Sequence, residues 1–272
     1  MSRLSRISML IDIHCHLTGD EYAPLGGVDT TIKAAVDGGV EYIVCSGYDL
    51  LSSRQAAELA ERHENVYFCA GFHPGELHKY TDGDLDGIRA LTAHKKCIAV
   101  GEIGLDYHFE NNPPKEVQRA LFIEQLRLAD EVGLPVVLHS RDAAAETLDL
   151  LKENVSLLRR GGLMHCYSYS PEMTADFAAL GLSFSFGGTS TFKNAKKVWE
   201  SVKRIPGTRI LSETDCPYLT PAPYRGEFPN QPYNVKFVVE RLAELREVSL
   251  EEMQRQIQNN AFALFPKLRT GR

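Results

Sequence analysis

The sequence predicts an α/β fold in which eight parallel strands and the helices between them close into one (β/α)8 barrel. Short apolar segments alternate eight times with amphipathic ones, and the connections are short except after the eighth segment. This alternation is typical of a parallel sheet, and eight repeats are enough to close it. The length of 272 residues fits one barrel, so we predict a single domain over residues 1–272, with residues 1–9 as a short N-terminal leader.

The predicted strands are short runs of mainly apolar residues, as expected for strands that are buried on both faces. Glycine, proline or polar residues bound most of these runs. In chain order the strands are residues 10–14, 42–46, 66–72, 97–103, 135–140, 162–165, 182–186 and 209–213.

The segments between the strands carry apolar residues at helical spacing. Ser52 and Ser249 are candidate N-caps of the second and last helices, and Gly133 marks the end of the fourth. A proline-rich stretch, residues 217–232, separates the eighth strand from the next helix. In chain order the predicted helices are residues 30–37, 52–63, 85–93, 115–132, 143–153, 171–180, 195–205, 235–247 and 249–263.

Composition excludes several classes of function. The formal net charge of −6 argues against a surface that binds polyanions generally, although a local basic pocket remains compatible with it. The six cysteines are scattered without a CxxC pair, which predicts reduced thiols. The sequence shows no secretion signal and no apolar run long enough to cross a membrane. We therefore predict a cytoplasmic protein with no membrane partner.

The predicted strands end in residues that can bind metal ions. Active sites of such barrels form at the C-terminal ends of the strands. Five of the nine histidines occur there, and His14 and His16 project the same way because strand side chains alternate. The five are His14, His16, His73, His139 and His165, and nearby carboxylates are Glu102, Asp106, Asp142, Glu213 and Asp215. Nitrogen and oxygen ligands with a carboxylate to bridge them suit a pair of Mg, Mn or Zn ions.

Seven segments of the chain, in order, resemble those of the TatD family of metal-dependent deoxyribonucleases, which are amidohydrolase-like TIM barrels. The segments are LIDIHCH (10–16), AGFHP (70–74), GEIGLDYH (101–108), PVVLHSRDA (135–143), MHCYS (164–168), TFKNA (191–195) and ETDCPYL (213–219). They span nearly the whole chain, so the resemblance applies to the full barrel and not to one motif.

The resemblance implies which residues hold the ions. One ion would be bound by His14, His16, Glu102 and Asp215. The second would be bound by Glu102, His139 and His165, so that Glu102 bridges the two. His73 and Glu213 would lie next to these ligands and orient them or transfer protons, and Asp215 would act as the general base. The alternative for His73 and Glu213 is a buried hydrogen-bonding residue without a chemical role.

Three basic residues follow predicted strands five, seven and eight and are candidates for binding a phosphodiester: Arg141, Lys193 and Arg225. The alternatives are solvated charges or a local pair between Arg141 and Asp142. Tyr107, Tyr167 and Tyr218 are candidates for stacking on bases or, equally, for packing.

The chain departs from the family pattern at three places. Tyr169 stands where the family usually has glycine, residues 225–232 form a segment that is one residue longer, and Glu227 places an acid where the family tends to have a base. These departures affect substrate contacts and not the metal ligands.

The resemblance implies a DNase that trims single-stranded DNA from the 3′ end by means of a water activated by two divalent ions. We expect a monomer whose partner is single-stranded DNA or another phosphodiester. A second hypothesis is that the same metal centre hydrolyses an ester or amide bond, as in a D-aminoacyl-tRNA deacylase or a small-molecule amidohydrolase. A third reading is a degenerate barrel that only binds, but all six ligand positions are filled.

Overall fold

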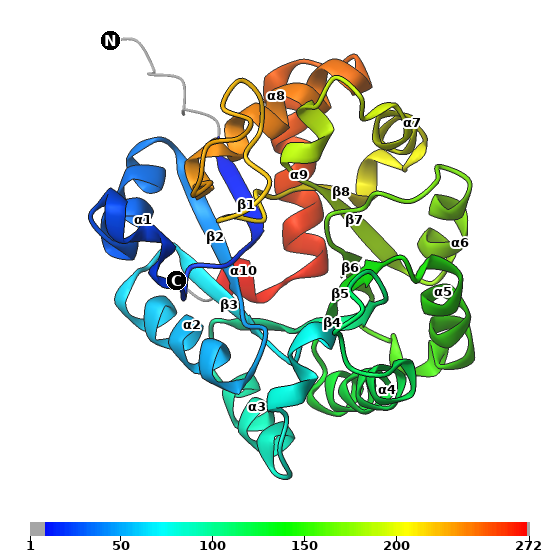
Figure 1. Cartoon of the computed structure of the whole chain (residues 1–272). Coiled ribbons are helices and arrows are strands. Elements are labelled where there is room, and N and C mark those ends of the chain that lie inside the picture. Colours follow the sequence, from blue (N-terminus) through cyan, green and yellow to red (C-terminus); the bar gives the residue numbers. More distant parts are fainter. Residues whose placement is uncertain (1–8, 271–272) are drawn as a thin grey trace.

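The computed structural model describes residues 9–270, so residues 1–8 of the expected leader lie outside the described residues. Eight strands form one sheet in the order β1 to β8, and all seven pairs of neighbours are parallel (Figure 1). The predicted (β/α)8 barrel is confirmed. The strands are β1 (Leu10–Cys15), β2 (Val40–Ser46), β3 (Val66–Ala70), β4 (Cys97–Asp106), β5 (Val136–Arg141), β6 (Gly162–Met164), β7 (Leu182–Phe186) and β8 (Ile210–Ser212).

Side chains join β8 back to β1. Ser212 Oγ donates a hydrogen bond of 2.8 Å to the backbone oxygen of Ile11. The backbone N–H and the hydroxyl of Thr214 donate to the two carboxylate oxygens of Asp12, at 2.8 and 2.6 Å. All four residues are buried, so these bonds hold the first and last strands together inside the molecule.

Helices surround the sheet, as Figure 1 shows. They are α1 (Val28–Asp37), α2 (Leu50–Arg62), α3 (Asp84–Thr92), α4 (Lys115–Val132), α5 (Ala144–Glu153), α6 (Met173–Ala179), α7 (Lys196–Arg204), α8 (Val235–Arg246), α9 (Leu250–Leu264) and α10 (Lys267–Thr270). Short 3-10 helices, among them η1 (Asp20–Leu25) and η2 (Pro74–Lys79), follow β1 and β3 and were not predicted.

Two of the three predicted helix ends are confirmed. The Ser249 side chain caps α9 by accepting from the backbone N–H of Glu252, and Gly133 ends α4 with a left-handed φ of 69°. Ser52 is not the cap of α2. Asp49 is the cap, and the Asp49 and Ser52 side chains each accept from the other residue's backbone N–H. A carboxylate three residues upstream therefore replaces the serine that the sequence suggested.

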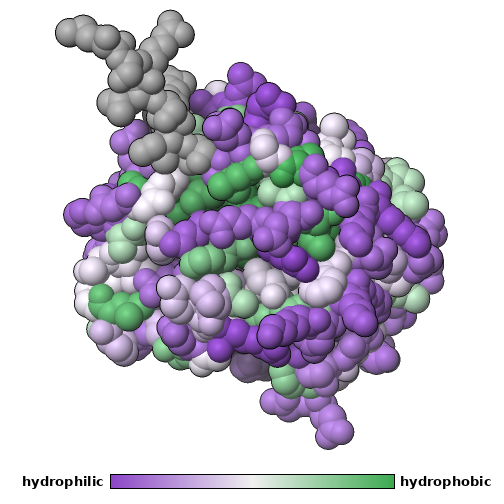
Figure 2. Space-filling model, turned by 90° about the horizontal axis from the view of Figure 1, so that it is seen from above, coloured by the Kyte–Doolittle hydropathy of each residue, from purple (hydrophilic) through white to green (hydrophobic). Residues whose placement is uncertain are grey.

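The core follows the predicted burial on both faces of the strands. Every residue of β1, β4 and β7 is buried, whereas the last three residues of β5 become progressively more exposed. The outer surface is mostly hydrophilic, and hydrophobic side chains reach it in a band between hydrophilic ridges (Figure 2). Within residues 9–270, no helix combines the length and the apolar character needed to cross a membrane.

Candidate metal centre

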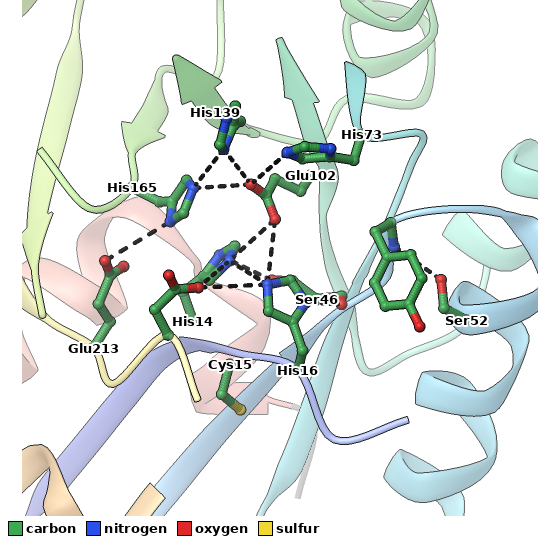
Figure 3. Close-up of polar contacts among 12 residues, drawn as sticks. His14, Cys15, His16, Ser46, Ser52, His73, Glu102, His139, His165 and Glu213 are labelled. Carbon is green, nitrogen blue, oxygen red and sulfur yellow. Dashed lines mark hydrogen bonds and ion pairs between the residues drawn. The ribbon is translucent and has the colours of Figure 1, made fainter. Parts of the chain in front are cut away.

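The centre is built around Glu102, a buried carboxylate in β4. One of its oxygens, Oε1, lies 2.8 Å from His139 Nδ1 and 2.8 Å from His165 Nε2 (Figure 3). These two nitrogens lie 3.2 Å from each other. His139 belongs to β5, and His165 directly follows β6. We call His139, His165 and Glu102 Oε1 the β5 group.

The other oxygen, Glu102 Oε2, faces the side chains of β1. It lies 3.2 Å from His14 Nε2 and 3.5 Å from His16 Nε2. Asp215 Oδ1 lies 3.7 and 3.5 Å from the same two nitrogens. The backbone places Asp215 there because its N–H donates to the His14 carbonyl oxygen at 3.0 Å. We call His14, His16, Asp215 and Glu102 Oε2 the β1 group.

Ser46, the last residue of β2, lies behind both imidazoles of the β1 group. Its carbonyl oxygen is 3.0 Å from His16 Nδ1, and its hydroxyl is 3.0 Å from His14 Nδ1. A carbonyl only accepts hydrogen bonds, so His16 Nδ1 carries the proton and Nε2 of the neutral ring turns a lone pair toward Glu102. The Cys15 sulfur between the two histidines points away from the cluster, as strand alternation predicts (Figure 3).

Carboxylates lie behind the imidazoles of the β5 group. Asp106 Oδ2 is 3.1 Å from His139 Nε2, so that nitrogen carries the proton and Nδ1 offers its lone pair to the centre. Glu213 Oε1 is 3.7 Å from His165 Nδ1, and both atoms are buried without a hydrogen-bond partner. The Ser185 hydroxyl donates to the other Glu213 oxygen at 2.5 Å and holds that side chain in place.

His73, three residues after β3, turns a protonated nitrogen toward the centre. Its Nδ1 accepts a 3.0 Å hydrogen bond from the backbone N–H of Gly75. The proton of the neutral ring is therefore on Nε2, which lies 3.7 Å from Glu102 Oε1. His73 thus turns an N–H toward the centre, whereas His139 turns a lone pair there, and only the second arrangement suits a metal ligand.

The electrostatics match a charged cluster. Burial alone would raise the pKa of Glu102, but the neighbouring imidazoles, His165 first, hold it well below its usual range. Burial has the opposite effect on an imidazole and would lower the pKa of His139, but Asp106 and Glu102 raise it. For His73, burial and then His139 lower the pKa to about 3, so this ring is neutral at ordinary pH.

The residues present fit divalent metal ions. At 2.8 Å, an imidazole lone pair and a carboxylate oxygen repel each other unless a proton or a cation compensates them. The candidate ligand atoms of His14, His16 and Glu102 lie within 4.8 Å of one another, and so do those of Glu102, His139 and His165. Asp215 forms a third such set with His14 and His165. Nitrogen and oxygen donors of this kind bind Zn, Mn and related ions.

Comparison with known proteins agrees with this site. A family model described as "TatD related DNase" matches residues 11–266. The chain belongs to the TatD family. It is 42% identical over 257 residues to the uncharacterized metal-dependent hydrolase YabD of Bacillus subtilis, which covers 94% of this chain and 99% of that protein.

Further TatD relatives cover the chain to the same extent. The uncharacterized metal-dependent hydrolase YcfH of Escherichia coli is 35% identical and covers 94% of this chain and 95% of that one. The crystal structure of YjjV, a TatD homologue from Escherichia coli, superposes with a TM-score of 0.88 at 32% identity, covering 96% of this chain and 99% of that one. This protein is a metal-dependent hydrolase of the TatD family.

The three predicted phosphate-binding residues have different contacts in the TatD barrel. The Arg141 guanidinium lies 5.0 Å over the Phe109 ring, and Asp142 pairs with His108 at 2.7 Å. Arg225 lies 4.0 Å over the Phe192 ring. Lys193 lines a cavity of about 520 Å³ whose walls also come from α7 and α8.

The aromatic candidates differ in exposure. Tyr167 is buried and packs against aromatic core residues. The hydroxyl of Tyr107 is buried, and Lys115 covers its ring at 4.2 Å. Only Tyr218 keeps more than half of its surface exposed, at 53%. Tyr169, one of the departures from the family pattern, bonds through its hydroxyl to Ser140 Oγ at 2.9 Å, which ties the loop after β6 to β5.

Sequence reasoning missed Ser46 and underrated Asp106. Serine is common at strand ends, and nothing else in the sequence marks Ser46 as a neighbour of the centre. Asp106 lies four residues after Glu102 in the same strand, so both side chains point to one face. This spacing was visible in the sequence.

Proposed function

We propose that this TatD protein hydrolyses phosphodiester bonds with two divalent ions and trims single-stranded DNA from the 3′ end. The observation that carries the proposal is that the two carboxylate oxygens of Glu102 face separate sets of imidazoles. A shared carboxylate suits a pair of ions, and paired ions suit in-line displacement at phosphorus. Preference for a strand end follows from the family resemblance and from the buried position of the ligands, which a free end reaches more easily than a duplex does.

Each group would hold one ion. The β1 group supplies His14, His16 and Asp215, the β5 group supplies His139 and His165, and both share Glu102. Bound divalent ions lower the pKa of a water and compensate charge on the attacking and leaving oxygens. Imidazoles favour Zn and Mn, and the carboxylates also admit Mg.

Asp215 is the best placed general base. Its side chain is 14% exposed, compared with 3% for Glu102, so it is the carboxylate of the centre that a water can reach. Burial would raise the pKa of Asp215, but His16 and the other imidazoles lower it, so the group is ionised and able to orient and deprotonate that water.

The remaining polar residues act on the ligands. The Nε2–H of His73 points at Glu102 Oε1 and steadies the shared carboxylate. Asp106 and Glu213 keep the rings of His139 and His165 turned toward the centre. Arg141 is the basic side chain next to the β5 group and would bind the phosphate of the substrate.

The experiment is a metal and substrate panel on the purified full chain. Metal-stripped protein is supplied with Mg, Mn or Zn and assayed on 3′-labelled and 5′-labelled single strands, on duplexes, on a chromogenic phosphodiester and on a D-aminoacyl ester. We expect two ions per chain and stepwise loss from the 3′ end of single strands. Asp215→Asn should lose this activity, whereas the matched control Asp142→Asn, at an exposed pair with His108, should keep it.

Two results would overturn the proposal. Cleavage of the ester without cleavage of any phosphodiester would assign the centre to ester or amide hydrolysis. A single bound ion with full activity would contradict the division of Glu102 between two ions.

A further inference from the structure

Exposed apolar side chains are concentrated in the segment that follows β8. Among the described residues nine large hydrophobic side chains are exposed, and four of them lie within residues 217–232. They are Tyr218 (53%), Leu219 (36%), Tyr224 (44%) and Phe228 (62%). Such a concentration on one short segment is typical of a binding surface, whereas scattered exposed residues are ordinary.

The most exposed two, Tyr218 and Phe228, form what we call the aromatic shelf. Their ring centroids are 6.4 Å apart and the ring planes are inclined by 39°. This distance is near the upper end of the range for direct aromatic pairs, and both residues are more than half exposed, so the rings remain open to a third planar group.

The shelf is held rigidly from below by Asn230, which is fully buried. The Asn230 amide donates to the carbonyl oxygens of Tyr218 and Thr214 at 2.7 and 3.1 Å, and its backbone N–H donates to Pro217 at 2.8 Å. The amide oxygen in turn accepts from the backbone of Gln231. Residues 217–218 and 230–231, near the two ends of the segment, are thus bonded to each other, so part of the entropic cost of ordering the segment is met before a ligand binds.

A backbone hydrogen bond also fixes the shelf beside the metal centre. The backbone N–H of Tyr218 donates to the Asp215 carbonyl oxygen at 3.0 Å, so the shelf begins one turn from a member of the β1 group. Arg225 lies on the same segment and is exposed, with its guanidinium 4.0 Å over the Phe192 ring. Stacking rings next to a guanidinium are the usual components of sites for unpaired nucleotides.

The net charge of the segment favours binding by ring stacking over electrostatic attraction of phosphates. Residues 217–232 contain one basic and one acidic residue, Arg225 and Glu227, so their charges cancel. A neutral shelf gives a contribution to binding that changes little with salt, whereas contacts between lysine or arginine and phosphate weaken steeply. Two rings are also far too small an area for a stable protein partner.

We propose that the aromatic shelf binds the bases of the nucleotides next to the bond being cleaved, and thereby selects unpaired strands. The inference rests on the proposed phosphodiesterase function. Paired bases are already stacked within a duplex and would have to leave it to reach the rings. Phe228 lies within residues 225–232, the segment that the sequence analysis expects to be one residue longer than the family pattern.

The test is a double-mutant cycle in which the ring is removed from the protein, the base is removed from the DNA strand, or both are removed. Tyr218→Ala, Phe228→Ala and the matched control Tyr224→Ala, whose ring packs 5.5 Å from Phe237 in α8, are assayed on a single strand and on the same strand with abasic sites near its 3′ end. We expect each shelf variant to lose roughly 5- to 150-fold in kcat/KM on the intact strand, the range for one base on one ring. On the abasic strand the wild type and these variants should be equal, at unchanged metal content and at both low and high salt.

The outcomes separate the two proposals. If wild type and shelf variants prefer the intact strand equally, the shelf is overturned and the phosphodiesterase function stands. If the wild type cleaves no phosphodiester with Mg, Mn or Zn, the proposed function fails. Binding of a labelled single strand then decides on the shelf, which is overturned if wild type and Phe228→Ala bind equally or not at all.

Discussion

The β1 group and the β5 group share one carboxylate but differ in what lies behind their imidazoles. Both rings of the β1 group contact a single neutral residue, Ser46. Both rings of the β5 group face carboxylates, Asp106 and Glu213. The β1 group in turn has a second carboxylate, Asp215, among its candidate ligands, whereas the β5 group has only Glu102.

This difference teaches how the chain distributes negative charge around the centre. An imidazole that donates to a carboxylate is a more basic ligand than one that donates to a carbonyl. A cation in the β5 group would therefore be stabilised through more basic imidazoles, whereas a cation in the β1 group would be stabilised by the Asp215 carboxylate directly. Removing the shared carboxylate should damage both groups, and removing a residue behind one group should damage that group alone.

The largest effect is expected from Glu102→Ala, which removes the oxygen atoms common to both groups. Metal content should fall at both positions, and hydrolysis should fall by about three orders of magnitude, since paired ions contribute several kcal/mol to the transition state. Elemental analysis and the chromogenic phosphodiester measure the two quantities. Full activity in this variant would refute a shared carboxylate.

Asp106→Asn tests the β5 group alone. An amide has one acceptor oxygen, so it cannot accept from both His139 Nε2 and the backbone N–H of His108 as the carboxylate does. We expect roughly 10- to 100-fold weaker binding of one ion, with the other retained. Metal titration of the stripped protein checks this, with Asp142→Asn as control. Equal weakening of both ions would show that the groups are not separable.

The stability of the metal-free protein should fall as pH rises above about 6.5. The pKa values of His139 and His165 are raised in the folded chain, so the folded state binds more protons than the unfolded state in this range. Their contribution is complete below about pH 6.5 and is lost as pH rises through the raised values. The pKa values of His14 and His73 are lowered, so these two alter stability only below that pH.

Metal binding should reverse this trend, because protons and ions compete for the same nitrogens. Denaturant unfolding between about pH 6.5 and 8.5 should give a free energy of unfolding that falls with pH for the metal-free protein. The difference in this free energy between the metal-loaded and the metal-free protein should grow over the same range. The Asp106→Asn variant, which lacks one cause of the raised His139 pKa, should show a shallower fall. A metal-free stability that rises with pH would contradict the assignment.

The smallest effect is expected from Ser46→Ala. The carbonyl oxygen that holds His16 remains, and only the hydroxyl contact to His14 Nδ1 is lost. One neutral hydrogen bond corresponds to about 0.5–1.5 kcal/mol, or roughly a 2- to 12-fold weaker affinity at the β1 group. Metal titration measures it, and a loss comparable with that of Asp106→Asn would remove the contrast between the groups.

Much of the barrel and the cluster could be predicted because their rules are local. The period of two in a strand places His14 and His16 on one face, and the strand-end rule brings Glu102, His139 and Asp215 to one end of the barrel. Glu102 and the proposed ligands do converge, although their binding of metal stays a prediction.

Features that depend on spatial neighbours could not be predicted in the same way. Ser46 contacts His14 across 32 positions of sequence, and nothing in either strand signals that pairing. Asp49 and Ser52 both resemble caps, and only the backbone path of α2 decides between them. Lys193 follows β7 as expected, but its side chain lines a cavity with α7 and α8, which no single segment reveals.

The bonds between Asp12 and Thr214 give the two groups different histories during synthesis. The β5 group uses residues 102–165, so all its members exist once residue 165 has been made. The β1 group joins His14 to Asp215, so it waits about fifty residues longer, a delay of several seconds at ordinary translation rates. The β1 group is therefore complete only when β8 and β1 come together, later than the β5 group. Under the proposed function, hydrolysis that needs both ions would require synthesis through at least residue 215.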